Sequence, residues 1–185
     1  MARRQPRETE PMAVASAPLA VEIVEGFLHS APVDVRAMAS ALDLRIVEED
    51  LGEISGKIER DWLDPDDFVI TINERHAEVR KRFTIAHEIA HFVLHRDLIG
   101  NGIVDDALYR DARIGDQKER QANRYAARLL MPRDLVRSVW NEGYSTKVGL
   151  ASRFWVSTAV AEIRMEELGC VLWPAPAKTE VDLPF

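Results

Sequence analysis

The chain has 185 residues, with 46% hydrophobic and 30% charged side chains, which is typical of a soluble globular protein. The net charge of −7 argues against a chain that attracts nucleic acid over its whole surface, and no apolar run approaches the roughly 18 residues that cross a bilayer. A single cysteine, Cys170, excludes an internal disulfide framework, and we therefore expect a cytoplasmic protein.

The first half of the chain predicts short helices followed by a small sheet. The expected elements are helices over 18–30 and 35–42, a strand over 44–47, and a hairpin of strands over 56–60 and 68–73. Asp34 stands where it can cap the second helix. The strand over 56–60 would offer its edge to an extended peptide, a hypothesis that rests only on its place before the next helix.

The second half predicts helices. They are expected over 76–95, 117–130, 134–141, 146–154 and 157–168, with an irregular charged loop over 100–116. Ser157 is a plausible N-cap of the last helix and Gly169 a stop signal. The pattern predicts a mainly helical α+β fold, with a small antiparallel or mixed sheet before the 76–95 helix and a helical lobe at the C-terminal end.

The same sequence patterns divide the chain into four segments. They are a disordered tail at 1–17, a core at 18–132, a C-terminal helical lobe at 133–170, and a second tail at 171–185. Both tails contain proline and lack helical or strand periodicity.

The helix over 76–95 carries the sequence His-Glu-Ile-Ala-His from His87 to His91. On a helical wheel the two histidines lie about 40° apart and one turn from each other, so both imidazoles can reach one metal ion. The apolar residues fall on the opposite side, so the histidines are expected to face a cleft. Glu88 lies beside them, where a base acting on a metal-activated water is needed.

Two histidines leave a zinc site one protein ligand short. Glu119 lies on the inward face of the helix over 117–130, because it precedes Ala122 by three residues. A carboxylate that points to the core is costly unless it is paired or bound to metal. The alternative is a residue at a helix start that meets the helix dipole or an arginine. We interpret Glu119 as the third ligand of one Zn²⁺ per chain.

Several other residues could assist this site. His95 continues the spacing, but its Cα lies about 12 Å from that of His87, too far to share one ion easily. We expect it to support a ligand or to line the cleft. Asn123 lies one turn after Glu119. Tyr109, Tyr125 and His95 are candidate donors to the oxyanion that forms when a peptide bond is attacked. The remaining histidines, His29 and His76, are expected at the surface.

The two helices together resemble a known family. The segments from Arg82 to His95 and from Glu119 to Pro132 strongly resemble the ImmA/IrrE family of metallopeptidases, and the similarity extends over most of the chain. Tyr125 stands where the family more often has Phe, and Met165 where it often has Leu; neither change touches the metal residues.

The resemblance implies a zinc metallo-endopeptidase of the gluzincin-like kind (HExxH plus a downstream Glu). His87, His91 and Glu119 would be its ligands and Glu88 its catalytic acid and base. It also implies that the substrate is a helix-turn-helix repressor or antitoxin-like partner, whose cleavage relieves repression. Toxin–antitoxin-like pairs and transcription regulation are the expected setting, with activity gated by a partner.

Two alternative functions remain. The chain could be a partner-binding module that recognises a repressor or antitoxin without cleaving it. It could also be a DNA-binding regulator, because the helices around Trp155 loosely resemble a helix-turn-helix. Positive and negative charges balance in that segment, whereas a DNA reader normally has a basic excess. We therefore expect the C-terminal lobe to pack on the core or to recognise the partner protein, and direct nucleic-acid binding is not expected.

Overall fold

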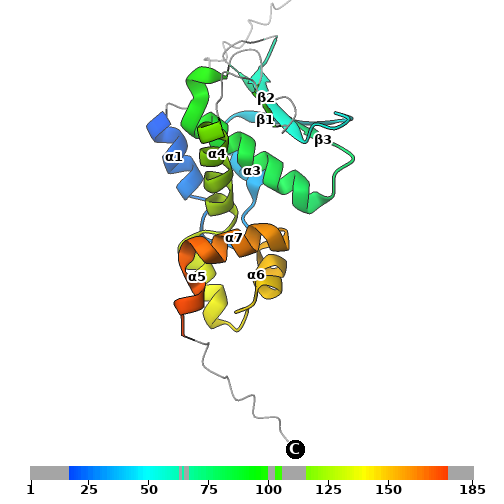
Figure 1. The fold of residues 1–185 in the computed structure, drawn as a ribbon. Coiled ribbons are helices and arrows are strands. Elements are labelled where there is room, and N and C mark those ends of the chain that lie inside the picture. The colour runs from blue at the N-terminus through cyan, green and yellow to red at the C-terminus, as the bar shows by residue number, and fades with distance from the viewer. Residues whose placement is uncertain (1–16, 63, 65–66, 100–102, 106–115, 175–185) are drawn as a thin grey trace, which may run out of the picture.

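The computed structural model describes residues 17–62, 64, 67–99, 103–105 and 116–174 (Figure 1). Its elements, in chain order, are α1 (Ala17–Glu25), α2 (Val35–Ala41), β1 (Leu44–Glu49), β2 (Gly56–Arg60), β3 (Phe68–Asn73), α3 (Glu78–His95), the short 3-10 helix η1 (Arg96–Leu98), β4 (Ile103–Asp105), α4 (Asp116–Leu130), α5 (Arg133–Asn141), α6 (Lys147–Phe154), α7 (Thr158–Leu168) and the 3-10 helix η2 (Cys170–Leu172). The predicted α+β, mainly helical class is confirmed.

The sheet is mixed and has the strand order β1-β3-β2-β4. β3 lies inside it, parallel to β1 and antiparallel to β2, so the predicted hairpin is present. All six residues of β3 are buried, because the strand has a neighbour on each edge and covered faces. The sequence pattern had placed only alternate residues of this strand on a buried face.

β4 corrects two expectations. It falls inside the stretch 100–116, which was expected to be an irregular loop. It also pairs antiparallel with Gly56–Ile58 of β2. This part of β2 is therefore not a free edge, and the hypothesis that it receives an extended peptide is wrong there. A strand of three residues has too little periodicity to be predicted from sequence, and its pairing with β2 spans more than 40 residues of chain.

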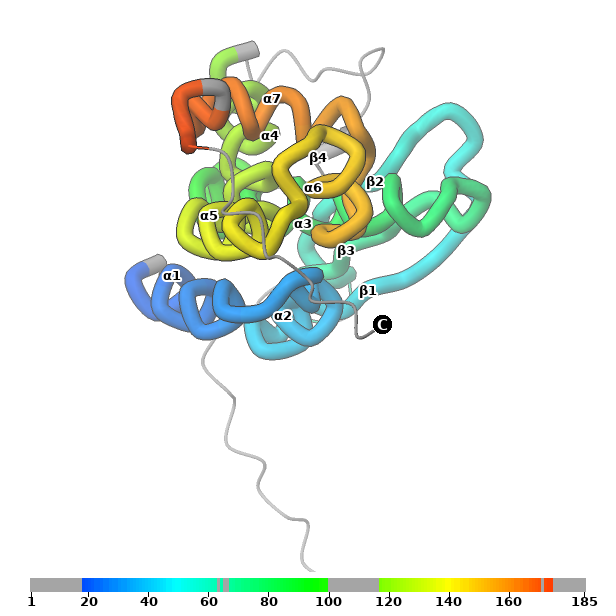
Figure 2. Tube along the Cα trace, turned by 90° about the horizontal axis from the view of Figure 1, so that it is seen from below, coloured from blue at the N-terminus to red at the C-terminus, as the bar shows by residue number. Residues whose placement is uncertain are grey.

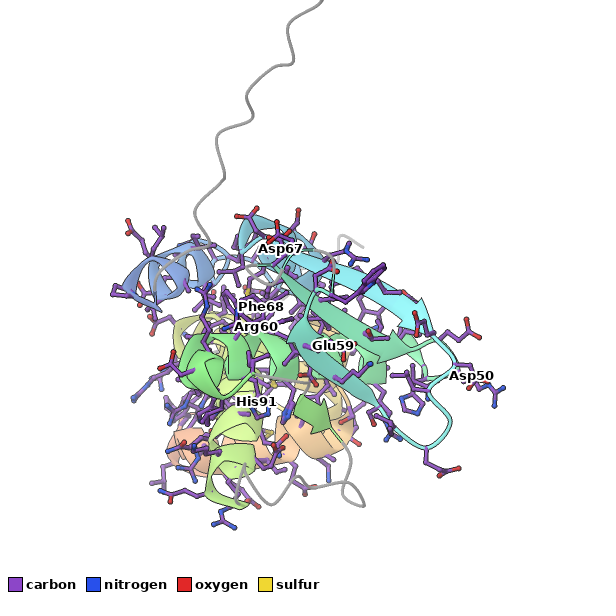
Figure 3. The ribbon with its side chains drawn as sticks, turned by 90° about the horizontal axis from the view of Figure 1, so that it is seen from above. Asp50, Glu59, Arg60, Asp67, Phe68 and His91 are labelled. Carbon is purple, nitrogen blue, oxygen red and sulfur yellow. The ribbon has the colours of Figure 1, made fainter. Side chains whose placement is uncertain are left out.

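α3 packs directly against the sheet. The rings of Phe68 on β3 and Phe92 on α3 meet edge to face at 5.2 Å between centroids. Arg60 lies over the ring of Phe68, with 4.9 Å between its guanidinium carbon and the ring centroid (Figure 3). At Gly56 the backbone of β2 comes so near that an added Cβ would overlap the Thr84 methyl of α3. The sheet thus fixes the position of α3 from one side.

Helices cover the rest of α3. α4 packs closely along it, and α1 and α2 lie along another flank of the molecule, α2 next to β1 (Figure 2). The predicted cap of α2 is present: Asp34 Oδ1 accepts hydrogen bonds from the backbone N–H groups of Arg36 and Ala37. In the part of the chain that the structure describes, no helix combines the length and the apolar character needed to cross a membrane.

The C-terminal lobe, residues 133–170, consists of α5, α6 and α7 at the end of the molecule away from the sheet (Figure 1). The predicted Ser157 cap and the Gly169 stop are both present, the latter with φ of +66°. Its buried side chains join the same hydrophobic core as those of α3 and the sheet, and this core continues across residue 132.

Two buried arginines also fasten the lobe to the core. Arg164 of α7 donates from Nε to the carbonyl of Met131, and Arg82 of α3 donates to the carbonyl of Trp155. The chain just beyond the lobe, expected to be an irregular tail from residue 171, starts as η2. Trp173 then packs edge to face on Trp140, with ring centroids 5.4 Å apart. The expected tail at 1–17 lies almost wholly outside the described residues.

Candidate metal centre

The two histidines of the HExxH sequence lie side by side on α3. Because they are four residues apart, their side chains leave the helix one turn from each other in nearly the same direction. The Nε2 atoms of His87 and His91 are 2.9 Å apart, and their ring centroids are 4.6 Å apart. Both side chains are fully buried. Figure 3 shows His91 within the helical part of the molecule.

α4 brings Glu119 to the same point. Its Oε2 lies 3.3 Å from His87 Nε2, and its Oε1 lies 3.3 Å from His91 Nε2. One potential ligand atom of each of the three residues lies within 4.8 Å of the other two. The three residues that the sequence singled out as ligands are therefore together, although 27 residues of chain lie between His91 and Glu119.

These spacings fit a zinc ion. Tetrahedral zinc with Zn–N and Zn–O bonds of about 2.0–2.2 Å holds its ligand atoms roughly 3.3 Å apart. The observed separations of 2.9 and 3.3 Å are close to that value. Two imidazoles and one carboxylate are also the donor set of many zinc sites that keep one position for water or substrate.

The protonation states of these residues favour a cation as well. Burial raises the pKa of Glu119, but hydrogen bonds with His87 and His91 outweigh burial and hold that pKa well below its usual range. Burial lowers the pKa of His91, and the hydrogen bond with Glu119 offsets this only in part. A carboxylate and a neutral imidazole are the forms that bind a divalent metal.

Glu88 follows His87 on α3 and is completely buried. The wheel had predicted that His87 and His91 face a cleft, with Glu88 beside them. Instead the helix is buried on all sides from Thr84 to Val93, because α4 packs across the face that carries the histidines. Glu119 is the exception among the four residues, since 21% of its side chain is exposed. A substrate would reach the cluster most directly from the side of Glu119.

His95 lies behind His91. Its Nδ1 is 3.2 Å from His91 Nδ1, and its Nε2 is 3.1 Å from Gln121 Oε1 on α4. An amide oxygen only accepts hydrogen bonds, so His95 Nε2 must carry the proton. The Nδ1 of a neutral His95 then accepts from His91 Nδ1–H. In a metal-bound form, where the ion would replace the hydrogen bond between His91 and Glu119, this tautomer leaves the lone pair of His91 Nε2 for the ion.

Of the other expected helpers, two line neighbouring cavities and one lies outside the described residues. Asn123 is exposed and lines a cavity with Phe83. Tyr125 is half-buried and lines a cavity between α1, α3 and α4, and burial raises its pKa. Tyr109 lies outside the described residues. Cys170 is buried, and burial raises the pKa of its thiol, which argues against a thiolate ligand.

Sequence reasoning missed Gln121 and the cavity lined by Phe83. Gln121 lies two residues after Glu119 and hence on a different side of the helical wheel, so the inward face of α4 gave no signal for it. Phe83 lies one turn before His87, with 6.4 Å between the ring centroids, so the four-residue spacing was a signal that could have found it.

Comparison with known proteins defines the class to which this fold and site belong. Residues 39–166 match the family model described as the IrrE N-terminal-like domain, so the chain belongs to this family of metallopeptidases, as the sequence resemblance predicted.

Among individual relatives, the chain is 28% identical over 126 residues to Metallopeptidase ImmA of Bacillus subtilis (strain 168), an alignment that covers 67% of this chain and 70% of that protein. The fold resembles that of a Mycobacterium tuberculosis transcriptional regulator, with a TM-score of 0.54, 18% sequence identity, and coverage of 80% of this chain and 47% of that one. The chain thus spans about half the length of that solved structure, and the likeness concerns the fold alone.

Proposed function

We propose that this chain is a zinc-dependent endopeptidase that cleaves a helix-turn-helix repressor or antitoxin-like partner and so relieves repression. The observation that carries the peptidase proposal is the convergence of His87, His91 and Glu119 beside a buried Glu88. The choice of substrate is supported only by membership of the family.

His87, His91 and Glu119 would hold the zinc ion. A bound zinc ion supplies a Lewis acid that polarises a peptide carbonyl and activates water for attack on it. The Glu88 carboxylate takes one proton from the attacking water and delivers it to the leaving amine, so that one peptide bond and one water molecule become an acid and an amine. Burial around Glu88 keeps bulk water away from this proton transfer.

The DNA-binding alternative is less well supported. In the segment from α6 to α7, Lys147 pairs with Glu162 at 2.9 Å, Arg153 donates to the carbonyl of Ala31, and Arg164 is buried. These three basic side chains are therefore engaged with the protein itself rather than presented to phosphates. A DNA reader instead presents a continuous basic surface.

The decisive experiment mixes the purified, zinc-loaded chain with a helix-turn-helix repressor encoded beside it and follows the repressor by mass spectrometry. We expect one main cleavage with the native protein, and none with Glu88→Gln or after chelation. Glu53→Gln is the matched control, because Glu53 is an exposed carboxylate in the loop before β2. Equal cleavage by the Glu88→Gln protein would overturn the catalytic role of Glu88.

Binding of the repressor without cleavage would instead favour the non-catalytic, partner-binding alternative. A parallel mixture with operator DNA and no repressor tests the DNA-binding alternative. Binding that weakens steeply with salt would support it.

A further inference from the structure

A cavity of about 360 Å³ opens between α3, α4 and α7. Phe83 of α3, Ala127 of α4, and Val160 and Ile163 of α7 line it with apolar surface. Ile163 is 55% exposed, so its apolar side chain is accessible from solvent. We name this cavity the Phe83 pocket.

The Phe83 pocket adjoins the metal residues along both helices. Phe83 lies one turn before His87, with 6.4 Å between the ring centroids. Asn123, which also lines the pocket, lies one turn after Glu119. One helical turn rises about 5.4 Å, and neighbouring Cα atoms of a peptide are about 3.8 Å apart. A side chain in this pocket therefore belongs to a residue next to, or one removed from, a peptide bond placed at the metal residues.

The pocket has a positive rim. Arg120 and Arg124, both exposed on α4, line it together with Glu167 of α7. Glu167 is already shared: its Oε1 lies 3.2 Å from Arg124 Nε, and its Oε2 lies 2.9 Å from Arg164 Nη1. Glu167 thus pairs with the rim arginine Arg124 and with the buried Arg164, so the rim carries two arginines, Arg120 and Arg124, against one carboxylate. This excess of guanidinium groups favours a partner carboxylate beside the apolar space.

We infer that the Phe83 pocket selects the substrate: it binds one large apolar side chain, Leu or Phe in size, from a residue within two positions of the cleaved bond, next to an aspartate or glutamate that meets Arg120. This inference rests on the proposed peptidase function. The occupant is a segment of a protein partner, because apolar walls fit a side chain and the short positive rim fits a single acidic residue. A nucleic acid would need a longer basic track.

The test measures binding rather than turnover. The probe is a set of fluorescent 12-residue peptides of Ser, Gly and Ala, with Leu-Glu, Phe-Glu, Ala-Glu or Leu-Lys at the centre. The receptor is the full, zinc-loaded chain carrying Glu88→Gln. We expect the Leu-Glu and Phe-Glu peptides to bind at least about tenfold more tightly than the Ala-Glu peptide, as burial of a large apolar side chain implies. Equal binding of all four peptides overturns the inference.

Variants then locate the binding. Ile163→Asp should remove the Leu-over-Ala preference, and so should Ala127→Phe, which fills the pocket from α4. Val148→Asp on α6 is the matched control, because Val148 is also exposed, at 66%, but lies outside the pocket.

A second pair of variants tests the positive rim. Arg120→Glu should abolish the preference for the Leu-Glu peptide over the Leu-Lys peptide. Arg133→Glu should keep this preference, because Arg133 is an exposed arginine outside the pocket. The inference is wrong if both pocket variants bind like the parent, or if Val148→Asp weakens binding as much as Ile163→Asp does.

The pocket hypothesis and the peptidase hypothesis can fail independently, and the two failures give different results. If the chain binds the peptides selectively but cuts no repressor, the pocket hypothesis is supported and the peptidase hypothesis is wrong. If the chain cuts the repressor but binds all four peptides equally, the peptidase hypothesis is supported and the pocket hypothesis is wrong.

Discussion

Three side chains in series, Gln121, His95 and His91, connect the surface of α4 to the metal residues. Each link is a hydrogen bond of 3.1 to 3.2 Å, and in a neutral His95 the donation from Nε2 to Gln121 leaves Nδ1 as the acceptor for His91. Residues that hold a ligating imidazole from behind fix its tautomer and its orientation. His95 is thus a positioning residue: it acts on the metal through His91 and not by direct coordination.

We expect His95→Ala to weaken zinc binding about 10- to 100-fold, because His91 Nδ1–H would lose the acceptor that keeps the lone pair of His91 on Nε2, the atom that would bind the ion. Competition for zinc with a chromophoric chelator measures this loss. Gln121→Ala should have a smaller effect in the same direction. His29→Ala is the control, since His29 is exposed and distant in sequence from the cluster. Unchanged affinity in the His95→Ala protein would show that the hydrogen bond does not orient His91.

At the scale of elements, the site depends on how closely α3 lies on the sheet. The closest approach is at Gly56, where an added Cβ would overlap the Thr84 methyl and lie 2.9 Å from the Thr71 carbonyl oxygen. Thr84 precedes His87 by three residues, so any shift that relieves this overlap also moves the metal helix. A glycine is therefore required here for space and not for an unusual backbone angle.

We expect Gly56→Ala to lower the free energy of unfolding by about 1–3 kcal/mol, the usual cost of overpacking a core. Chemical denaturation followed by circular dichroism measures it. The double variant Gly56→Ala with Thr84→Ser should lose less than Gly56→Ala alone, because the serine lacks the methyl that the new Cβ would meet. If Thr84→Ser does not reduce the cost, the α3–sheet contact is not its cause.

At the scale of the whole molecule, the metal residues join separate parts of one core. His87 and His91 belong to α3 and Glu119 to α4, and α4 leads on to the C-terminal lobe, whose buried side chains share the same core. A ligand that binds the folded chain alone stabilises the whole cooperative unit, and a zinc ion held by both helices is such a ligand.

Zinc at about 100 times its dissociation constant should therefore stabilise the native chain by about 2.7 kcal/mol. Thermal unfolding with zinc and with a chelator measures the difference. The shift should disappear in Glu119→Ala and His87→Ala, and it should persist in His29→Ala. An equal shift in the Glu119→Ala protein would remove Glu119 from the ligand set.

The sequence by itself determined the features that depend on local chain geometry. Helical periodicity placed His87, Glu88 and His91 on one helix and Glu119 on the inward face of the next, because residues three or four apart share a helix face wherever the helix lies. Asp34, Ser157 and Gly169 marked helix ends by hydrogen bonds and backbone angles within a few residues. The mainly helical α+β class followed from the same signals.

The tertiary structure alone decided what depends on contacts between distant segments. Burial of the metal residues follows from the packing of α4 on α3, and the pairing of β4 with β2 closes a loop that no local pattern marks. The tertiary structure also set His95 against Gln121 and formed the Phe83 pocket from three helices. Helical periodicity predicts which face of a helix is buried, but only the tertiary structure shows which residues contact that face.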